Sequence, residues 1–156
     1  MEVIEKGPAP SGEAGCIFCE LPRAGDDAAS LIVHRAEAGF VILNKYPYNN
    51  GHVMVIPHAH VADPGEVDPA DWAALAGLLR HTVSVVRGVY QPGGVNLGMN
   101  LGAPAGAGVP GHLHWHVVPR WDGDTNFMPV LGETKVMPQH LARSREALAA
   151  AFESTP

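Results

Sequence analysis

The chain has 156 residues, of which 46% are hydrophobic and 17% are charged, and this composition favours one globular domain over a disordered chain. Its formal net charge of -6 offers no basic surface for general nucleic-acid binding, so a phosphate ligand must be held by local groups. Residues 1–15 lack an apolar signal-peptide core, and no apolar run approaches the roughly 18 residues of a membrane span. We therefore expect a cytoplasmic protein that makes no contact with membranes or nucleic acid.

Residues 1–15 are rich in Gly, Pro, Ala and Glu, and are predicted to form a flexible arm ahead of one domain, residues 16–156. This domain opens on the sequence CIFC, which carries both cysteines of the chain, Cys16 and Cys19. A disulfide between them would close a very small loop and constrain little of the chain. The spacing fits half of a four-ligand zinc site better, although a redox pair or two unused thiols would share the pattern.

Short segments rich in β-branched and aromatic residues predict β-strands. They cover residues 31–35, 39–44, 52–57, 95–102 and 112–120. Turn residues such as Gly51 separate the second segment from the third, which favours an antiparallel meander. Gly98 stands inside the fourth segment and suggests that another group approaches the backbone closely there.

Two helices are expected. Residues 68–90 repeat apolar side chains every three or four positions, with Asp68 suited to the N-cap and Pro69 to the first turn. Residues 138–152 predict a closing helix, whereas residues 121–138 show no pattern that we can interpret. The predicted fold is α+β: a five-stranded antiparallel sheet with one long helix on a face and a C-terminal helix.

Three histidines, His112, His114 and His116, occupy alternate positions of the last predicted strand, so their side chains share one face. The apolar residues between them share the other face, which we expect to pack against the long helix. The histidines could chelate a catalytic metal, or one imidazole could attack phosphorus as a nucleophile. The preceding loop, residues 100–111, contains four glycines and no bulky side chain. Such a loop lets backbone N–H groups approach an anion, which favours phosphate chemistry.

These motifs resemble the histidine triad superfamily. The sequence HLHWHVV fits its pattern His-φ-His-φ-His-φ-φ, where φ is apolar, and CIFC, NKYPYNNGHVMVIPHAH and NLGAPAGAG precede it in the corresponding order. The segment PRWDGDTNFMPVLGETKVMP is similar to the bacterial branch of diadenosine tetraphosphate phosphorylases and hydrolases. The resemblance implies a homodimeric nucleotide hydrolase or transferase. Such an enzyme cleaves dinucleoside polyphosphates or nucleoside phosphoramidates at the α-phosphate, through a covalent nucleotidyl-histidine and without a catalytic metal.

By motif position, the resemblance implies that His114 is the nucleophile and that His116 contacts the phosphate and the leaving-group oxygens. It implies that His112 supports the site from the start of the strand, and that His52 is a fourth histidine that buttresses the triad. The remaining nucleotide-binding positions that match are Asn44, Asn100, Gly106 and Gly108. Many members place Gln, Ser or Thr just before the triad, but this chain does not, so backbone N–H groups are expected to contact phosphate.

Relatives with a similar CxxC bind structural zinc through two cysteines and two histidines. The ligands implied here are Cys16, Cys19, His60 and His112, with His58 the weaker, solvent-exposed candidate. Two other readings of the chain are a metal-dependent hydrolase that uses the triad as ligands and a non-catalytic nucleotide-binding module.

Several other side chains have simpler expectations. Trp72 and Trp115 are expected in the core. Trp121 could stack on a base or pack at a dimer seam, and Arg120 could contact a distal phosphate or close a salt bridge. Three further histidines are expected on the surface: His34, His81 and His140.

Overall fold

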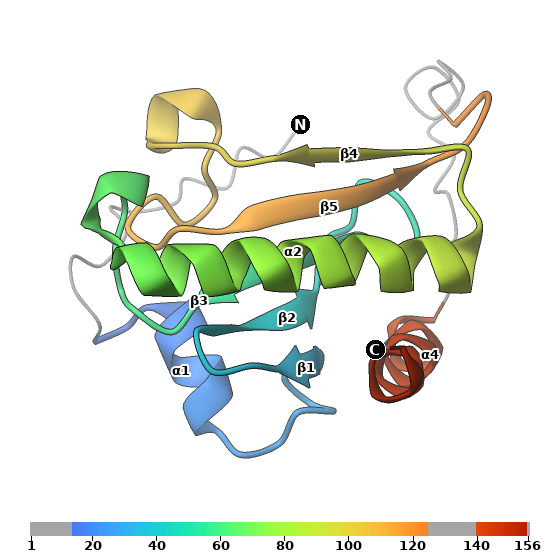
Figure 1. Ribbon diagram of the computed structural model, residues 1–156, viewed down its shortest axis with the longest axis horizontal. Coiled ribbons are helices and arrows are strands. Elements are labelled where there is room, and N and C mark those ends of the chain that lie inside the picture. The colour runs from blue at the N-terminus through green and yellow to red at the C-terminus, as the bar shows by residue number, and fades with distance from the viewer. Residues whose placement is uncertain (1–13, 125–139, 156) are drawn as a thin grey trace, which may run out of the picture.

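A five-stranded antiparallel sheet forms the centre of the computed structural model, which describes residues 14–124 and 140–155 (Figure 1). In space the strands follow the order β1-β2-β3-β5-β4. Their bounds are β1 Ile32–Arg35, β2 Gly39–Leu43, β3 Val53–Pro57, β4 Gly94–Gly98 and β5 Trp115–Arg120. The predicted α+β fold is confirmed, and so are the strand count and the antiparallel pairing.

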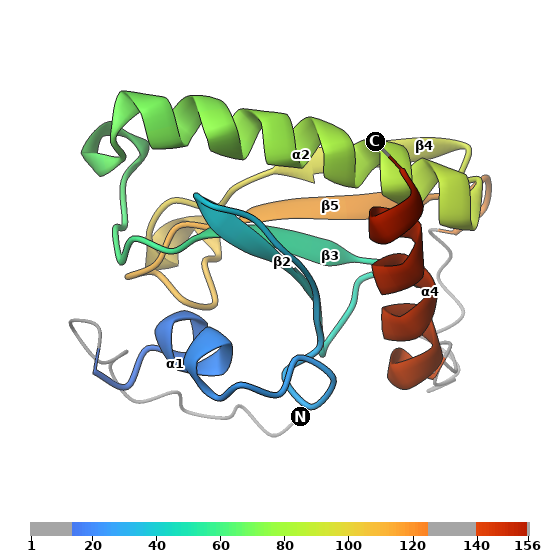
Figure 2. The same ribbon diagram turned by 60° about the horizontal axis from the view of Figure 1, so that its bottom comes forward.

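Two helices flank the sheet on one side and one lies on the other. Helix α2, Pro69–Tyr90, runs along one face, and α4, Leu141–Ser154, packs against α2 and β1 (Figure 2). Helix α1, Ile17–Arg23, lies on the opposite face. None of the helices in the two described ranges has the length and apolar character needed to span a bilayer.

The predicted bounds of the long helix are confirmed, because both of its ends are chemically marked. The Asp68 side chain accepts a hydrogen bond from the Ala70 N–H, and Pro69 occupies the first turn. The helix stops at Gln91, whose φ of 45° is left-handed and whose N–H bonds the Arg87 carbonyl.

The strands alternate their side chains between two apolar layers. On the α2 face the core contains Val53, Val55 and Trp115 together with Leu75 of the helix. Trp115 also meets Trp72, with ring centroids 5.0 Å apart. The apolar residues between the triad histidines therefore pack against the long helix, as predicted. The α1 face forms a smaller layer that contains Phe18, Cys19, Phe40, Ile42, Met54 and Ile56.

A tight turn between β2 and β3 directs the chain into the histidine cluster. Gly51 has a φ of +77°, and a Cβ placed there would lie 2.5 Å from the ring of Tyr90. A side chain would be strained by the backbone conformation and would also collide with the ring, so glycine is required. The next residue, His52, is fully buried.

Two strand predictions are too long. The last strand begins at Trp115 and not at residue 112, because the Leu113 N–H bonds the Val61 carbonyl at 2.7 Å instead of joining the ladder. The fourth ends at Gly98, where its pairing with His116 of β5 ends. None of the described residues makes the close approach expected at Gly98, since a Cβ placed there would meet no described atom within 4 Å.

Two histidines that were expected on the surface are half-buried. The rings of His34 on β1 and His81 on α2 pack against Phe152 of α4, with centroids 4.6 and 5.1 Å from its ring. The error arises because α4, which returns from the far end of the chain, covers them. His140 is exposed, as expected. Most of the predicted arm, residues 1–15, lies outside the described residues, as does most of the uninterpreted segment 121–138.

Candidate active site and metal cluster

The triad histidines gather on the α1 face of the sheet, where the segment before β5 meets β3. The side chain of Phe18 from α1 lies against two of them, with ring centroids 5.6 Å from His112 and 5.2 Å from His114. The rings of His114 and His116 are 5.0 Å apart, and His52 lies 5.1 Å from His116. The predicted shared face is therefore correct, although only His116 belongs to the strand itself.

The backbone sets the tautomer of His114. Its Nδ1 atom lies 2.8 Å from the carbonyl oxygen of His112, so Nδ1 carries the proton and donates it to that carbonyl. Burial lowers the pKa of His114, although the same hydrogen bond opposes the shift, and the ring is neutral near pH 7. In this tautomer the Nε2 atom keeps a lone pair, as a nucleophile requires.

A chain of hydrogen bonds gives His116 the opposite polarity. The Tyr48 N–H donates to Nδ1 of His52 at 3.1 Å, so the proton of a neutral His52 lies on Nε2. That Nε2–H donates to Nδ1 of His116 at 2.9 Å. A neutral His116 must then carry its own proton on Nε2, where it is a hydrogen-bond donor.

The electrostatics keep these rings neutral. Burial is the main cause that lowers the pKa of His52 to about 4, and the nearby rings of His116 and His114 add to the shift. Burial, followed by the proximity of His114, also lowers the pKa of His116. The amide nitrogen of Asn44 lies 3.3 Å from Nδ1 of His52, so it shares the acceptor used by the Tyr48 N–H.

Two hollows meet at this cluster. The larger, of about 660 Å³, is lined by apolar side chains and by His114, His116, Asn44, Gly106 and Gly108. The second, of about 620 Å³, lies on the other side of His116 and contains Asn100. Among the residues described here, only Tyr48 and His116 line both hollows. The structure thus brings the predicted nucleotide-binding residues to one place except Asn100, which lines the neighbouring hollow.

The glycine-rich loop forms one wall of the larger hollow. Gly106 has a φ of +91°, a conformation that L side chains rarely adopt. The amide nitrogen of Asn100 would lie 3.6 Å from a Cβ at this position. The loop therefore places backbone atoms, and no bulky side chain, next to His114 and His116.

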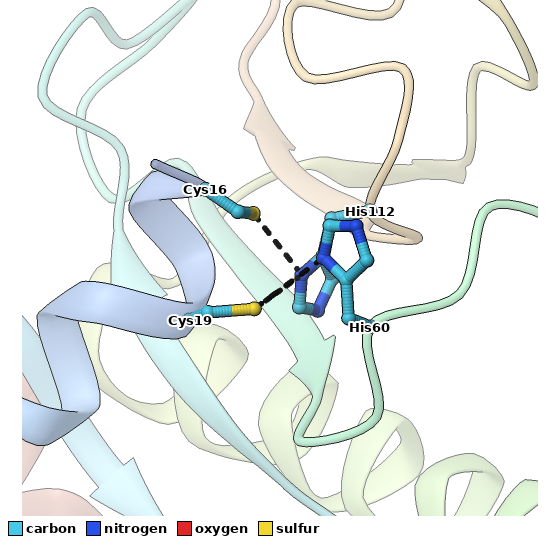
Figure 3. A group of neighbouring side chains, drawn as sticks. All are labelled: Cys16, Cys19, His60 and His112. Carbon is cyan, nitrogen blue, oxygen red and sulfur yellow. Dashed lines mark hydrogen bonds between the residues drawn. The ribbon is translucent and has the colours of Figure 1, made fainter. Parts of the chain in front are cut away.

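Four buried or half-buried side chains form a second cluster behind the triad. They are Cys16 and Cys19 from the start of α1, His60 from the loop after β3, and His112 (Figure 3). Their ligand atoms all lie within 4.8 Å of one another. Nδ1 of His112 lies 3.4 Å from Sγ of Cys16 and 3.5 Å from Sγ of Cys19, and Nδ1 of His60 lies 3.4 Å from Sγ of Cys19.

The donor set fits a tetrahedral metal ion. Zinc bonds of about 2.3 Å to sulfur and about 2.0 Å to nitrogen place such donors roughly 3.5 Å apart at tetrahedral angles. Nε2–H of His112 donates to the Pro57 carbonyl at 3.0 Å, which directs its Nδ1 atom to the cysteines. The cluster could therefore bind a metal ion. His58 is exposed and bonds the Ala36 carbonyl outside the cluster, as expected of the weaker candidate.

One contact in the site was not foreseen from the sequence, and another had been expected. Phe18 packs against both His112 and His114, but no local pattern connects a residue of CIFC with histidines more than 90 positions later. Arg120 forms an ion pair with Asp124 at 2.6 Å, which confirms the salt bridge that was one of its two expectations. The position of Asp124, four residues away, was the available signal.

Comparisons with known proteins identify relatives that share the histidine triad. The HIT domain family model matches residues 26–123. The chain is 37% identical over 153 residues to an AP-4-A phosphorylase of Mycobacterium tuberculosis, covering 98% of this chain and 78% of the relative.

Solved structures with similar folds include a Zn-bound histidine triad family protein from Mycobacterium smegmatis. It has a TM-score of 0.72 and 27% identity, covering 92% of this chain and 96% of that one. A hypothetical histidine triad nucleotide-binding protein from Sulfolobus tokodaii has a TM-score of 0.73 and 26% identity, covering 89% of this chain and 93% of that one. With its histidine motif, its sheet and the domain match in agreement, the chain belongs to the histidine triad family.

Proposed function

We propose that the protein cleaves dinucleoside polyphosphates or nucleoside phosphoramidates at the α-phosphate through a covalent nucleotidyl intermediate on His114. The observation that carries the proposal is the tautomer of His114, whose Nδ1–H is bonded to the His112 carbonyl and whose Nε2 keeps its lone pair. The ring also lines the larger hollow beside the glycine loop. The similarity to an AP-4-A phosphorylase supports the choice of substrate class.

In the first step, Nε2 of His114 attacks the α-phosphorus, and an N–P bond forms as the bond to the departing oxygen, or to the departing nitrogen of a phosphoramidate, breaks. That nitrogen takes up a proton from solvent and leaves as the neutral amine. A polyphosphate leaves as a stable anion, so it needs a hydrogen bond more than it needs a proton. Nε2–H of His116 supplies that bond, because its other nitrogen is held by His52. The positive charge on the His114 ring is stabilised by the His112 carbonyl.

In the second step, water or the oxygen of inorganic phosphate attacks the same phosphorus. The N–P bond breaks and its electron pair returns to Nε2 of His114, which regenerates the neutral ring. When water is the acceptor a proton passes to solvent, whereas a phosphate dianion attacks through an oxygen that carries no proton. Hydrolysis and phosphorolysis therefore use the same residues and differ only in the acceptor.

The larger hollow suits the nucleotide. Its apolar wall would receive the base and sugar, with Asn44 at the nucleoside end. Backbone N–H groups near Gly106 and Gly108 would contact the phosphate oxygens, because no Gln, Ser or Thr side chain precedes the triad. Asn100, whose amide lies against Gly106, would contact the phosphate from the second hollow.

We assign the cluster of Cys16, Cys19, His60 and His112 to a structural zinc ion. Bound zinc would tie the start of α1 to the segments before β5 and after β3, with no part in bond cleavage. The donor set and spacing support this role, and the Mycobacterium smegmatis relative is a Zn-bound protein.

The proposed state of the enzyme is a homodimer that joins two sheets. β4 lies at one end of the strand order, and it exposes apolar side chains, with 52% of Leu97 and 46% of the nearby Leu101 accessible. An exposed edge strand with apolar side chains favours pairing with a second copy.

Trapping of the intermediate tests the proposed chemistry. After incubation with labelled diadenosine tetraphosphate or adenosine phosphoramidate and rapid quenching, we expect an adenylylated peptide that contains His114. The His114→Asn variant should give no adduct and lose at least about 10³-fold in kcat, as for other nucleophile removals. A metal-dependent hydrolase that uses the triad as ligands would instead lose activity on chelation and would turn over substrate without any adduct on His114. A nucleotide-binding module would show neither adduct nor turnover.

A further inference from the structure

The second hollow lies on the face of the β4–β5 pair opposite α2. His116, Val118 and Arg120 alternate along β5 and therefore share this face, opposite the side chains that pack on the long helix. In the neighbouring strand, Asn96 and Gly98 pair with Val118 and His116 and complete the floor. The hollow thus begins at the phosphate-facing histidine and extends along the sheet.

An arginine is fixed at the far end of this hollow. The guanidinium of Arg120 donates through Nε and Nη2 to the two oxygens of Asp124, at 2.6 and 2.7 Å, and through Nη1 to Oδ1 of Asn96 at 2.9 Å. Asp124 also accepts hydrogen bonds from the Asn49 amide at 2.7 Å and the Trp121 N–H at 3.1 Å. The carboxylate is therefore surrounded by donors, and it orients the guanidinium.

The position of His114, the proposed nucleophile, indicates which part of the substrate the second hollow would receive. His114 lines the nucleotide hollow but not the second one, whereas His116 lines both. In phosphoryl transfer the attacking and leaving atoms stand roughly in line on opposite sides of phosphorus. A leaving group displaced by His114 would therefore extend past His116 into the second hollow, and an incoming acceptor would arrive by the same route.

We propose that the second hollow binds the anionic phosphate groups beyond the α-phosphate, and that Arg120 contacts them. This inference rests on the proposed function, because it takes His114 as the nucleophile. A planar guanidinium matches the geometry of phosphate oxygens, and it keeps its charge at every pH at which the protein folds. The anion is either the polyphosphate tail that leaves or the inorganic phosphate that replaces it.

The distance between His116 and Arg120 at the two ends of the hollow would make Arg120 selective for long leaving groups. Four residues separate His116 from Arg120 along β5, which corresponds to about 13 Å between their backbones. A leaving group of one or two heavy atoms on the α-phosphorus would reach His116 and stop short of the guanidinium. A chain of further phosphates would extend to it.

The test compares a long and a short leaving group. For Arg120→Gln we expect the KM for diadenosine tetraphosphate to rise about tenfold or more, because a charged hydrogen bond to the anion is lost. The KM for adenosine phosphoramidate should change by less than about twofold, and Arg120→Lys should lie between the two. The matched control is Arg35→Gln, since Arg35 makes the same kind of exposed fork with Asp27 at 2.7 Å but lines neither hollow.

Two further measurements are needed. The first distinguishes a departing polyphosphate from incoming inorganic phosphate, and the second tests the hollow independently of the proposed function. If the arginine receives the incoming group, the KM for inorganic phosphate rises in Arg120→Gln; if it holds the departing tail, only the dinucleotide KM rises. Equal losses with both nucleotide substrates, or no change in the KM of either of them or of inorganic phosphate, would overturn the inference. Calorimetric binding of inorganic tripolyphosphate, weaker in Arg120→Gln than in Arg35→Gln, tests the hollow even if no turnover or adduct is found. Unchanged tripolyphosphate binding in Arg120→Gln would also count against it.

Discussion

The protonation pattern of the candidate active site is set by single atoms. One carbonyl oxygen makes Nε2 of His114 an acceptor, and one backbone N–H, that of Tyr48, makes Nε2 of His116 a donor through His52. The two rings are chemically alike but have opposite hydrogen-bonding polarity at their Nε2 atoms. The proposed nucleophile and the proposed hydrogen-bond donor are thus both neutral imidazoles, and no acidic side chain of the described residues takes part in this network.

His52 makes the folded protein sensitive to acid. Its pKa is about 4 in the folded state against 6.5 for an ordinary histidine, so the unfolded chain binds more protons between these values. The contribution of neutral His52 to the free energy of unfolding is complete above pH 6.5 and is lost as the pH falls towards 4. Over that range we expect a loss of about 3 kcal/mol that is absent from His52→Gln.

Urea unfolding at a series of pH values measures this difference, with His140→Gln as the control because His140 is exposed at the start of α4. His52→Gln should be less stable than the wild type at pH 7, with a flatter decline towards pH 4. Parallel declines of His52→Gln and wild type would show that the burial of this ring is not what makes the protein acid-sensitive.

At the scale of elements, α1 is the one helix of the described chain that its own sequence supports poorly. It has seven residues, contains Pro22, and lacks a side-chain cap at Cys16. Isolated helices shorter than about 12 residues are marginal in water, so α1 must depend on the burial of Phe18 and on its cysteines. We therefore expect the proposed zinc ion to hold this element against the sheet.

Substitution of one histidine in the loop after β3 tests this role. His60→Ala should reduce zinc from about one ion per chain to near zero and lower the Tm by roughly 5 °C or more, because structural zinc contributes to folding free energy. His58→Ala, only two positions earlier but outside the cluster, should keep both the metal and the Tm. Metal analysis and thermal unfolding supply the readouts; retention of zinc by His60→Ala would exclude this ligand set.

The strands and the long helix could be predicted because each has a local signal. α2 has an apolar face and a cap, whereas β2 and β3 are short apolar runs around a glycine turn. The start of β5 could not be predicted, because it is decided by a hydrogen bond to Val61, far away in sequence. Helix α1 was missed for a related reason, since it is stabilised by contacts with other elements and has no periodicity of its own.

The candidate site shows the same division. The alternation of His114 and His116 placed them on one face, and the family resemblance supplied His52 and the histidine partners of the cysteines. Neither indicated that the Tyr48 backbone sets a tautomer or that Arg120 lies at the end of a second hollow. Those facts depend on how separate strands and loops meet, and no local sequence pattern records them.

At the scale of the whole molecule, β4 leaves one edge of the sheet available for a partner. We expect the wild type to be a dimer by light scattering, and Leu97→Asp to be a monomer, since it places charge on an exposed apolar edge. Tyr46→Asp is the control, because Tyr46 is 78% exposed but lies on the turn after β2. A monomeric wild type, or a dimeric Leu97→Asp, would place the contact elsewhere or rule it out.

His112 connects the cysteine cluster with His114, and it uses its side chain for one contact and its backbone for the other. Its ring faces the cysteines and the Pro57 carbonyl, while its own carbonyl holds His114. The first task belongs to a side chain and the second to the peptide backbone, which every amino acid possesses. Exchange of this histidine for another residue would thus remove the ring, whereas the backbone carbonyl that bonds the proposed nucleophile, His114, would still be present. Mutation of residue 112 can therefore remove the imidazole that faces the cysteines, but it cannot remove the carbonyl that bonds His114.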